Sequence, residues 1–397
     1  MSQARMRMTF SFMVASLSFI MVFVTAGSPI PLFNIYQSDY GISNADLGLV
    51  SVAYFVAAAI ALLILGRLSD YLGRKKISII ALTAALLSCV LLFKWHGFWS
   101  LFFARLLQGL ACGMSAGALT AYIVDTALEK RRGLATIITS SAPMIGIPVG
   151  AIGCGFLILK GTDSQFLIYE IVGIILAVLI VSVILSVETI SPRKGAIRSL
   201  LPKLFIPQNS GPLLLVASMV FLATWSLGGF YQAYGPAIAH KYLGTNNPVL
   251  AALVFAAIMI LTPLGSPLSR FTSATVSVKL GMTIFIFALA TILISLNLGL
   301  AAPFIVASLC IGLAQGLAVT GAMGTLIHLT EQQHRAGLLS TIYLIAYCSA
   351  ASPALVASHF AKEVDLLHIS YGYGVLGLFA AMLALFFIRK VLKNTSS

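Results

Sequence analysis

Charged residues are scarce in this chain of 397 residues. Only 9% of its residues are Asp, Glu, Lys or Arg, whereas 59% are hydrophobic. A water-soluble domain carries about 25% charged residues. This chain has too little charge to cover a surface that faces water, so the composition excludes a soluble protein and predicts a polytopic membrane protein.

Cysteine and histidine are also sparse, and neither is arranged for chemistry. The five cysteines are odd in number, lie inside apolar runs and lack metal-ligand spacing. The six histidines are scattered, and no phosphate-binding Gly-x-x-x-x-Gly-Lys-Ser/Thr sequence occurs. We therefore expect no disulfide framework, no metal site, no cofactor and no ATP-driven step.

Long hydrophobic runs are abundant instead. A transmembrane helix needs about 20 predominantly apolar residues. Twelve such runs lie near residues 8–33, 47–66, 77–94, 99–124, 134–159, 166–187, 213–238, 249–268, 278–298, 302–329, 336–360 and 370–389. We predict an all-α membrane protein with twelve transmembrane helices in two six-helix halves, 1–187 and 213–397, joined by a linker at 188–212.

The positions of Lys and Arg indicate the orientation. Cytoplasmic loops carry an excess of these residues. If the N-terminus is inside, 19 of the 24 Lys and Arg residues fall in inner segments, four fall in outer loops, and Arg105 alone lies within a run. We expect both termini and the linker in the cytoplasm. Because the charge is spread over seven segments, the net charge of +13 does not indicate a nucleic-acid partner.

The two halves repeat weakly. Gln108-Gly109 matches Gln315-Gly316, and Pro148 corresponds roughly to Pro353. The offset is near half of the chain length, as a duplicated six-helix unit predicts. We therefore expect the two halves to be pseudo-symmetric.

The charged loop between the second and third runs, GRLSDYLGRKK from Gly66 to Lys76, holds the most specific motif. It resembles the signature loop of the major facilitator superfamily, Gly-x-Leu-x-Asp-x-x-Gly-Arg-Lys/Arg-Lys/Arg. The resemblance implies a transporter, not an enzyme, that moves a small molecule by alternating access between its halves. It also implies a conformational latch in which Asp70 faces the eleventh helix, and the latch residues would be Gly66, Asp70, Gly73, Arg74 and Asp125.

Arg105 is the single residue that most strongly indicates a functional site. A cation deep in a spanning helix costs about 2.5–3.5 kcal/mol on insertion scales and usually faces the bundle interior. Gln108 lies on the same helical face, beside a ridge of glycines that allows close helix packing, at Gly109, Gly113 and Gly117. ARLLQGLACG resembles the family's second signature, whose arginine is tied to proton coupling. The alternative is that Arg105 only extends to the outer surface.

The direction of transport and the coupling ion have weaker signals in the sequence. The stretch Gly146 to Gly150 is a degraded match to the family's antiporter motif and favours export. The first helix has no embedded acid, although many proton-coupled exporters of the family have one. Glu170 is the only candidate embedded acid, so Arg105 and Glu170 are the proton-coupling candidates. The proton gradient is the expected energy source.

The overall interpretation is proton-coupled efflux of an amphiphilic drug or metabolite by a monomer in the bacterial inner membrane. The alternative is an importer, a sugar-type porter or a metabolite symporter. Pro29 and Pro31 either line a cavity or only end the first helix. Polar and aromatic side chains on cavity-side helices are the candidates for the substrate cavity: Asn34, Gln37, Gln108, Tyr122, Trp225, Gln232, Gln315, Tyr343 and Tyr347.

Overall fold

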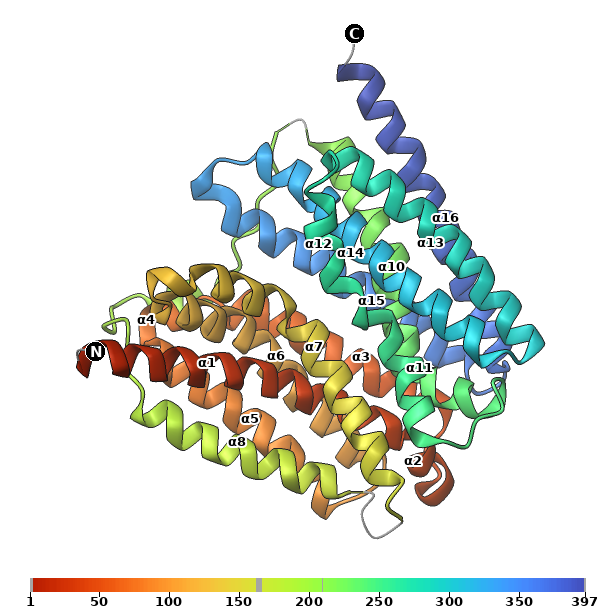
Figure 1. Cartoon of the computed structure of the whole chain (residues 1–397), viewed down its shortest axis with the longest axis horizontal. Helices are drawn as coiled ribbons and strands as arrows, with labels where there is room; N and C mark the ends of the chain where they lie inside the picture. The colour runs from red at the N-terminus through yellow and green to blue at the C-terminus, as the bar shows by residue number, and fades with distance from the viewer. Residues whose placement is uncertain (1–2, 162–165, 209, 396–397) are drawn as a thin grey trace. The chain divides into compact units, whose positions relative to one another are not determined.

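The computed structural model describes residues 3–161, 166–208 and 210–395. Within these residues the regular structure is entirely helical, and twelve helices are long and apolar enough to cross a membrane. The prediction of an all-α protein with twelve spans is therefore confirmed (Figure 1).

The first six spans comprise several shorter helical segments. Their bounds are α1 Gln3–Gly27, η1 Ile30–Leu32, α2 Phe33–Tyr40, α3 Asn44–Ile60, η2 Ala61–Leu65, α4 Ser69–Leu72, α5 Arg74–Lys94, α6 Phe98–Thr126, η3 Glu129–Arg131, α7 Arg132–Ile158 and α8 Leu167–Leu185. The short helix α9, Ala196–Ser199, lies in the segment that follows α8.

The last six spans are α10 Gly211–Lys241, α11 Pro248–Ile260 with α12 Thr262–Ser269, α13 Ala274–Leu298, α14 Ala301–His328, η5 Gln332–His334 with α15 Arg335–Phe360, and α16 Leu366–Thr395. Each run that was expected from hydropathy has a helix, and the ends differ by a few residues.

The two prolines of the first span interrupt the helix without ending it. Proline has no N–H group to continue the helical ladder. The Thr25 carbonyl, which the Pro29 nitrogen cannot bond, accepts the Ser28 hydroxyl at 2.9 Å. The chain then resumes as η1 and α2. Gly27 lies directly against the backbone of Ile147 in α7, so the break is buried in protein.

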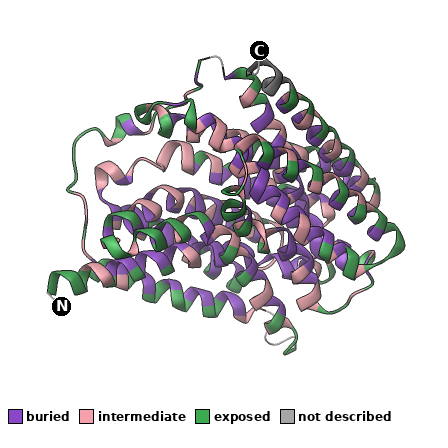
Figure 2. Ribbon diagram, turned by 45° about the horizontal axis from the view of Figure 1, so that its top comes forward, coloured by how far each residue is buried: buried purple, intermediate pink, exposed green. Residues whose placement is uncertain are grey.

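Large apolar side chains remain exposed on the outer faces of the helices. On α8, Ile174 is 59% exposed and Val178 is 60% exposed, whereas Leu176 is fully buried. Figure 2 shows buried and exposed residues alternating along individual helices. Contact with lipid accounts for this exposure, because hydrocarbon chains are as apolar as these side chains.

The chain divides into two compact units. One comprises Met1–Ile42 and Ala53–Pro202, and the other comprises Ser43–Val52 and Lys203–Ser397. In the first unit, α1 packs against α6, α7 and α8, and α5 packs against α6 and α8. In the second unit, α10 packs against α11, α14, α15 and α16, and α13 packs against α14.

Candidate functional site

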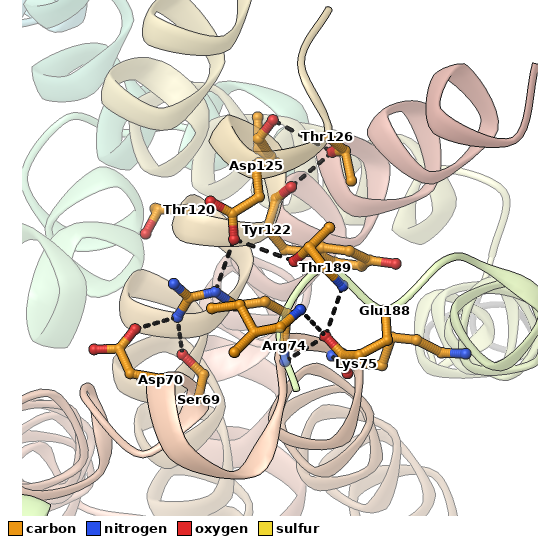
Figure 3. Close-up of polar contacts among 12 residues, drawn as sticks. Ser69, Asp70, Arg74, Lys75, Thr120, Tyr122, Asp125, Thr126, Glu188 and Thr189 are labelled. Carbon is orange, nitrogen blue, oxygen red and sulfur yellow. Dashed lines mark hydrogen bonds and ion pairs between the residues drawn. The ribbon is translucent and has the colours of Figure 1, made fainter. Parts of the chain in front are cut away.

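The signature loop forms a polar cluster around Arg74 (Figure 3). Gly73 has a φ of 101°, a conformation that glycine adopts without strain, and it starts α5 at Arg74. The Arg74 guanidinium donates to the Ser69 hydroxyl at 2.8 Å and to the Asp125 carboxylate at 3.0 Å. It also pairs with Asp70. One cation therefore joins carboxylates of α4 and α6.

Sequence reasoning missed Glu188. Its carboxylate accepts the backbone N–H groups of Arg74 at 2.9 Å and Lys75 at 3.1 Å. These are the first two residues of α5, where unpaired N–H groups and the helix dipole favour an anion. A signal was present in the sequence, because α5 begins with three basic residues and no acid. The acid that completes this helix end is 114 residues away along the chain.

The segment after Glu188 lies against the same loop. The backbone N–H of Arg193 donates to the Tyr71 carbonyl at 2.9 Å, and its guanidinium donates to the Asp70 carbonyl at 3.1 Å. The guanidinium also stacks over the Tyr71 ring at 4.7 Å. We call the segment from Glu188 to Arg193 the linker clasp, because it ties the start of the linker to the signature loop.

An open hollow of about 330 Å³ adjoins the linker clasp, and it is lined by Met8, Asp125, Val187, Glu188, Thr189 and Ile190. The Tyr122 hydroxyl donates to the Val187 carbonyl at 2.5 Å beside it. Tyr122 therefore lies at the end of α6 that carries Asp125, nearly five turns of helix away from Arg105.

Arg105 is fully buried on α6, with no exposed surface. One guanidinium nitrogen, Nη1, donates to the Ala26 carbonyl at 2.7 Å and to Gln108 Oε1 at 2.9 Å. The guanidinium carbon lies 4.5 Å from the centre of the Tyr54 ring. We call Ala26, Tyr54, Arg105 and Gln108 the Arg105 cluster, which helices α1, α3 and α6 build. Because no part of Arg105 is exposed, its side chain does not extend to the surface.

The glycine ridge explains how α6 approaches α3 so closely. A Cβ atom on Gly113 would lie 2.6 Å from the Ala61 side chain and 2.9 Å from the Leu62 nitrogen. Gly109 meets the Tyr54 carbonyl, and Gly117 meets the backbone of Gly66 in the signature loop. The expected close packing along this ridge is confirmed, and it places Tyr54 over Arg105.

The other candidates in the first unit lie apart from this cluster. Glu170 is exposed on α8, while its neighbour Tyr169 is buried and lies 3.5 Å from the Tyr36 hydroxyl. Among the described residues, no ion pair joins Glu170 to Arg105. Asn34 and Gln37 are half-buried on α2, after the proline break.

The second unit brings two of the aromatic candidates together. The rings of Trp225 on α10 and Tyr347 on α15 meet edge to face, with centroids 5.4 Å apart. Gln232 on α10 and Gln315 on α14 are buried, whereas Tyr343 is 37% exposed. Both glutamines are therefore interior polar groups of their unit.

Metal ligands do not gather anywhere in the part of the chain that the structure describes. No group of three or more His, Cys, Asp or Glu side chains there has the arrangement of a metal site. All five cysteines, which lie in that part, are unpaired thiols.

Comparison with known proteins identifies the family. The family model of the Major Facilitator Superfamily matches residues 12–355. The chain is a member of the major facilitator superfamily. It is accordingly a multi-pass membrane transporter and not an enzyme.

Two curated relatives are similar over part of the chain. The quinolone resistance protein NorA of Staphylococcus aureus (strain MRSA252) is 25% identical over 225 residues, which cover 56% of each protein. The multidrug resistance protein MdtL of Klebsiella pneumoniae (strain 342) is 27% identical over 251 residues, 60% of this chain and 61% of MdtL. The match thus spans less than two thirds of either relative.

A solved structure extends the likeness to the whole fold. A bacterial homologue of the human lysosomal transporter Spinster, in an inward-facing and unoccupied conformation, matches with a TM-score of 0.76. The alignment covers 99% of both chains at 14% identity, so it shows a common fold. The twelve-helix fold of the major facilitator superfamily is thereby established for this chain.

Proposed function

We propose that this transporter is a proton-driven exporter of a small amphiphilic drug or metabolite in the bacterial inner membrane. Support comes from the names of the two relatives, a quinolone resistance protein and a multidrug resistance protein. The single observation that carries the proposal is the complete burial of Arg105, because a cation held inside a transmembrane helix typically marks an ion or substrate path.

In this proposal the chain works as a monomer by alternating access, with 1–187 and 213–397 as its halves and 188–212 as the cytoplasmic linker. The Arg74 cluster is the conformational latch. Its physical basis is a charge network that two helix ends share, which favours the state in which Asp70, Arg74 and Asp125 meet. Asp70 would also approach the start of α15, whose amino end carries a partial positive charge.

The test is substrate-induced proton movement in everted membrane vesicles, with dyes, antibiotics and metabolites as the panel. We expect at least one compound to release protons from the lumen, and this release to vanish in Arg105→Ala. Arg132→Ala is the matched control, because the Arg132 side chain is 75% exposed. The control should keep the response.

Two results would contradict the proposal. Substrate flux without proton movement would indicate uniport or coupling to another ion. Substrate that accumulates in energised cells would instead indicate an importer or a symporter.

A further inference from the structure

The Arg105 cluster contains more hydrogen-bond donors than acceptors. Arg105 Nη1 is satisfied, but Nε and Nη2 of the same guanidinium have no hydrogen-bond partner among the described residues. The Gln108 amide nitrogen, Nε2, also has none. Three buried N–H-bearing nitrogens of this cluster therefore lack an acceptor among the described residues, although buried polar groups of this kind are normally bonded.

No carboxylate of the described residues pairs with this cluster. The ionisable groups that interact with the guanidinium are the hydroxyl and thiol groups of Tyr54, Cys112 and Tyr169. The ion pairs of the described residues use Asp70, Asp125, Glu129 and Asp365, and none includes Arg105. A buried cation is normally paired, because an isolated charge in a medium of low dielectric is expensive.

The polar character continues beyond the arginine. The Cys112 thiol lies 4.0 Å from the Val22 carbonyl, one turn of α1 before Ala26. Ser18 and Ser115 lie about one turn further along α1 and α6, and both hydroxyls are buried without a partner among the described residues. The facing sides of α1 and α6 thus carry a polar track that begins at Arg105.

We propose that the Arg105 cluster binds one acidic group of the transported compound, a carboxylate or a group of similar shape. The two oxygens of a carboxylate match the planar Nε–Nη2 edge of the guanidinium, which favours bidentate pairing. Gln108 Nε2 donates a third bond, and the Tyr54 ring covers one face of the guanidinium. The compound itself supplies the counter-charge that the chain lacks.

This inference rests on the proposed transport function, because Arg105 is closed off in this structure. An acid therefore reaches the guanidinium only when the surroundings of Arg105 open during the transport cycle. Substrate selection then depends on charge: the neutral amide of the same compound would leave the cation unpaired and should bind more weakly.

The experiment is equilibrium binding to the purified full-length protein in detergent, measured by calorimetry at constant ionic strength. The probes are matched pairs of aromatic carboxylic acids and their primary amides, namely 1-naphthoate with 1-naphthamide, biphenyl-4-carboxylate with its amide, and indole-3-acetate with its amide. We expect at least one acid to bind about 10- to 100-fold more tightly than its amide, as charge-assisted hydrogen bonds allow.

Three variants assign this preference to the cluster. Arg105→Gln should abolish the preference for the acid, and the exposed-site control Arg132→Gln should keep it. Arg105→Lys retains the charge but loses the planar pair of donors, so the preference should fall without vanishing. If Arg105→Gln does not fold, the Lys variant decides, and an unchanged preference there overturns the proposal.

The proposal is also overturned if every acid binds no better than its amide, or if no acid in the panel shows binding that depends on Arg105. Displacement of the acid from the wild-type protein by sodium bromide as effectively as by a second acid would assign the site to an inorganic anion instead. Because binding is measured without a gradient, these outcomes are independent of transport direction and proton coupling. Failure of the vesicle experiment would leave acid binding standing, and the reverse also holds.

Discussion

Two buried arginines of the same unit have opposite surroundings. Arg74 lies between the carboxylates of Asp70 and Asp125, which are 38% and 31% exposed. Arg105 is fully buried, bonds a carbonyl and an amide, lies under an aromatic ring, and forms no ion pair with any described residue. The chain therefore neutralises the cation that is near water and leaves uncompensated the one that is far from it.

This difference separates a structural charge from a functional one. A buried ion that the fold needed for stability would have its partner within the fold, as Arg74 does. A buried ion without a partner lowers stability and is retained where a ligand or a proton uses it. The predictions below test that distinction, in order of decreasing expected effect.

The largest effect should follow from exchanging each arginine for methionine, which keeps an unbranched apolar stem and removes the charged guanidinium. Arg105→Met should reduce transport by about 100-fold, because the desolvated charge is lost. Its melting temperature should stay unchanged or rise, because an unpaired buried charge is removed. Transport assays and thermal melts of the purified protein measure the two quantities.

Arg74→Met is the counterpart in the same pair of experiments. It leaves Asp70 and Asp125 facing each other without a cation, so the free energy of unfolding should fall by about 1–2 kcal/mol, limited by the exposure of both carboxylates. If Arg105→Met lowers the melting temperature as much as Arg74→Met does, the distinction between the two sites is wrong.

The glycine ridge gives the next largest effect, because it holds Tyr54 over Arg105. In Gly113→Ala the new methyl group lies 2.6 Å from the Ala61 side chain, so α3 and α6 must separate. We expect a loss of about 1–3 kcal/mol in the free energy of unfolding together with a loss of transport. Gly153→Ala is the control, because nothing lies within 4 Å of the added atom. Equal melting temperatures of the two variants would refute this account.

Glu188→Gln should lower the free energy of unfolding by a smaller amount, and it should affect only the surroundings of Arg74. The amide keeps one acceptor for the N–H groups of Arg74 and Lys75 but loses the charge at the start of α5, at a cost of about 1 kcal/mol. Trypsin should cut more quickly after Arg193 and Lys194, because the linker clasp is loosened. Glu129→Gln, at a side chain that is 86% exposed, is the control. Unchanged proteolysis would show that Glu188 does not hold the linker.

The smallest expected change in stability concerns Asp365. This carboxylate pairs with a cation, as the partners of Arg74 do, but it lies in an exposed loop. Hydrogen bonds from Lys241 and Tyr242 lower the pKa of Asp365 to about 2. The folded-state pKa is below the unfolded value of about 3.9, so the stabilisation is complete above pH 4 and is lost as the pH falls towards 2.

Asp365→Asn should therefore lower the melting temperature slightly at neutral pH, and this difference should disappear on acidification. The effect is small because the Asp365 side chain is 41% exposed. If the difference in melting temperature between the two proteins grows as the pH falls, the proposed stabilisation by ionised Asp365 is wrong. Melts of both proteins across the acidic range measure it.

Much of the fold and part of the site follow from sequence. Hydrophobic length alone predicted the twelve spans, since a bilayer sets a minimum length for each helix. The spacing of Gly109, Gly113 and Gly117 predicted close packing on one face of α6. Asp70, Arg74 and Asp125 were named together as latch residues, and the structure pairs Arg74 with both carboxylates. Their role as a latch stays a prediction.

Contacts between distant segments did not follow from sequence. From sequence, Glu188 was only the first residue of the predicted linker, and Arg193 was only a basic residue within it. Neither contact with the signature loop was predicted. Glu170 was the candidate embedded acid, yet its side chain is exposed on α8. Hydropathy does not indicate which side of a uniformly apolar helix faces the interior, because α8 offers no polar stripe to mark it.

The amino-acid sequence by itself determined the number of membrane spans, the basic signature loop and the presence of a cation inside the fourth span, α6. These features depend on local composition and on the thickness of a bilayer. Only the tertiary structure decided that Arg74 pairs with two carboxylates and that Arg105 pairs with none of those in the described residues. The physical reason is that charge compensation depends on distances between side chains of different helices, and these distances are set by how the helices pack.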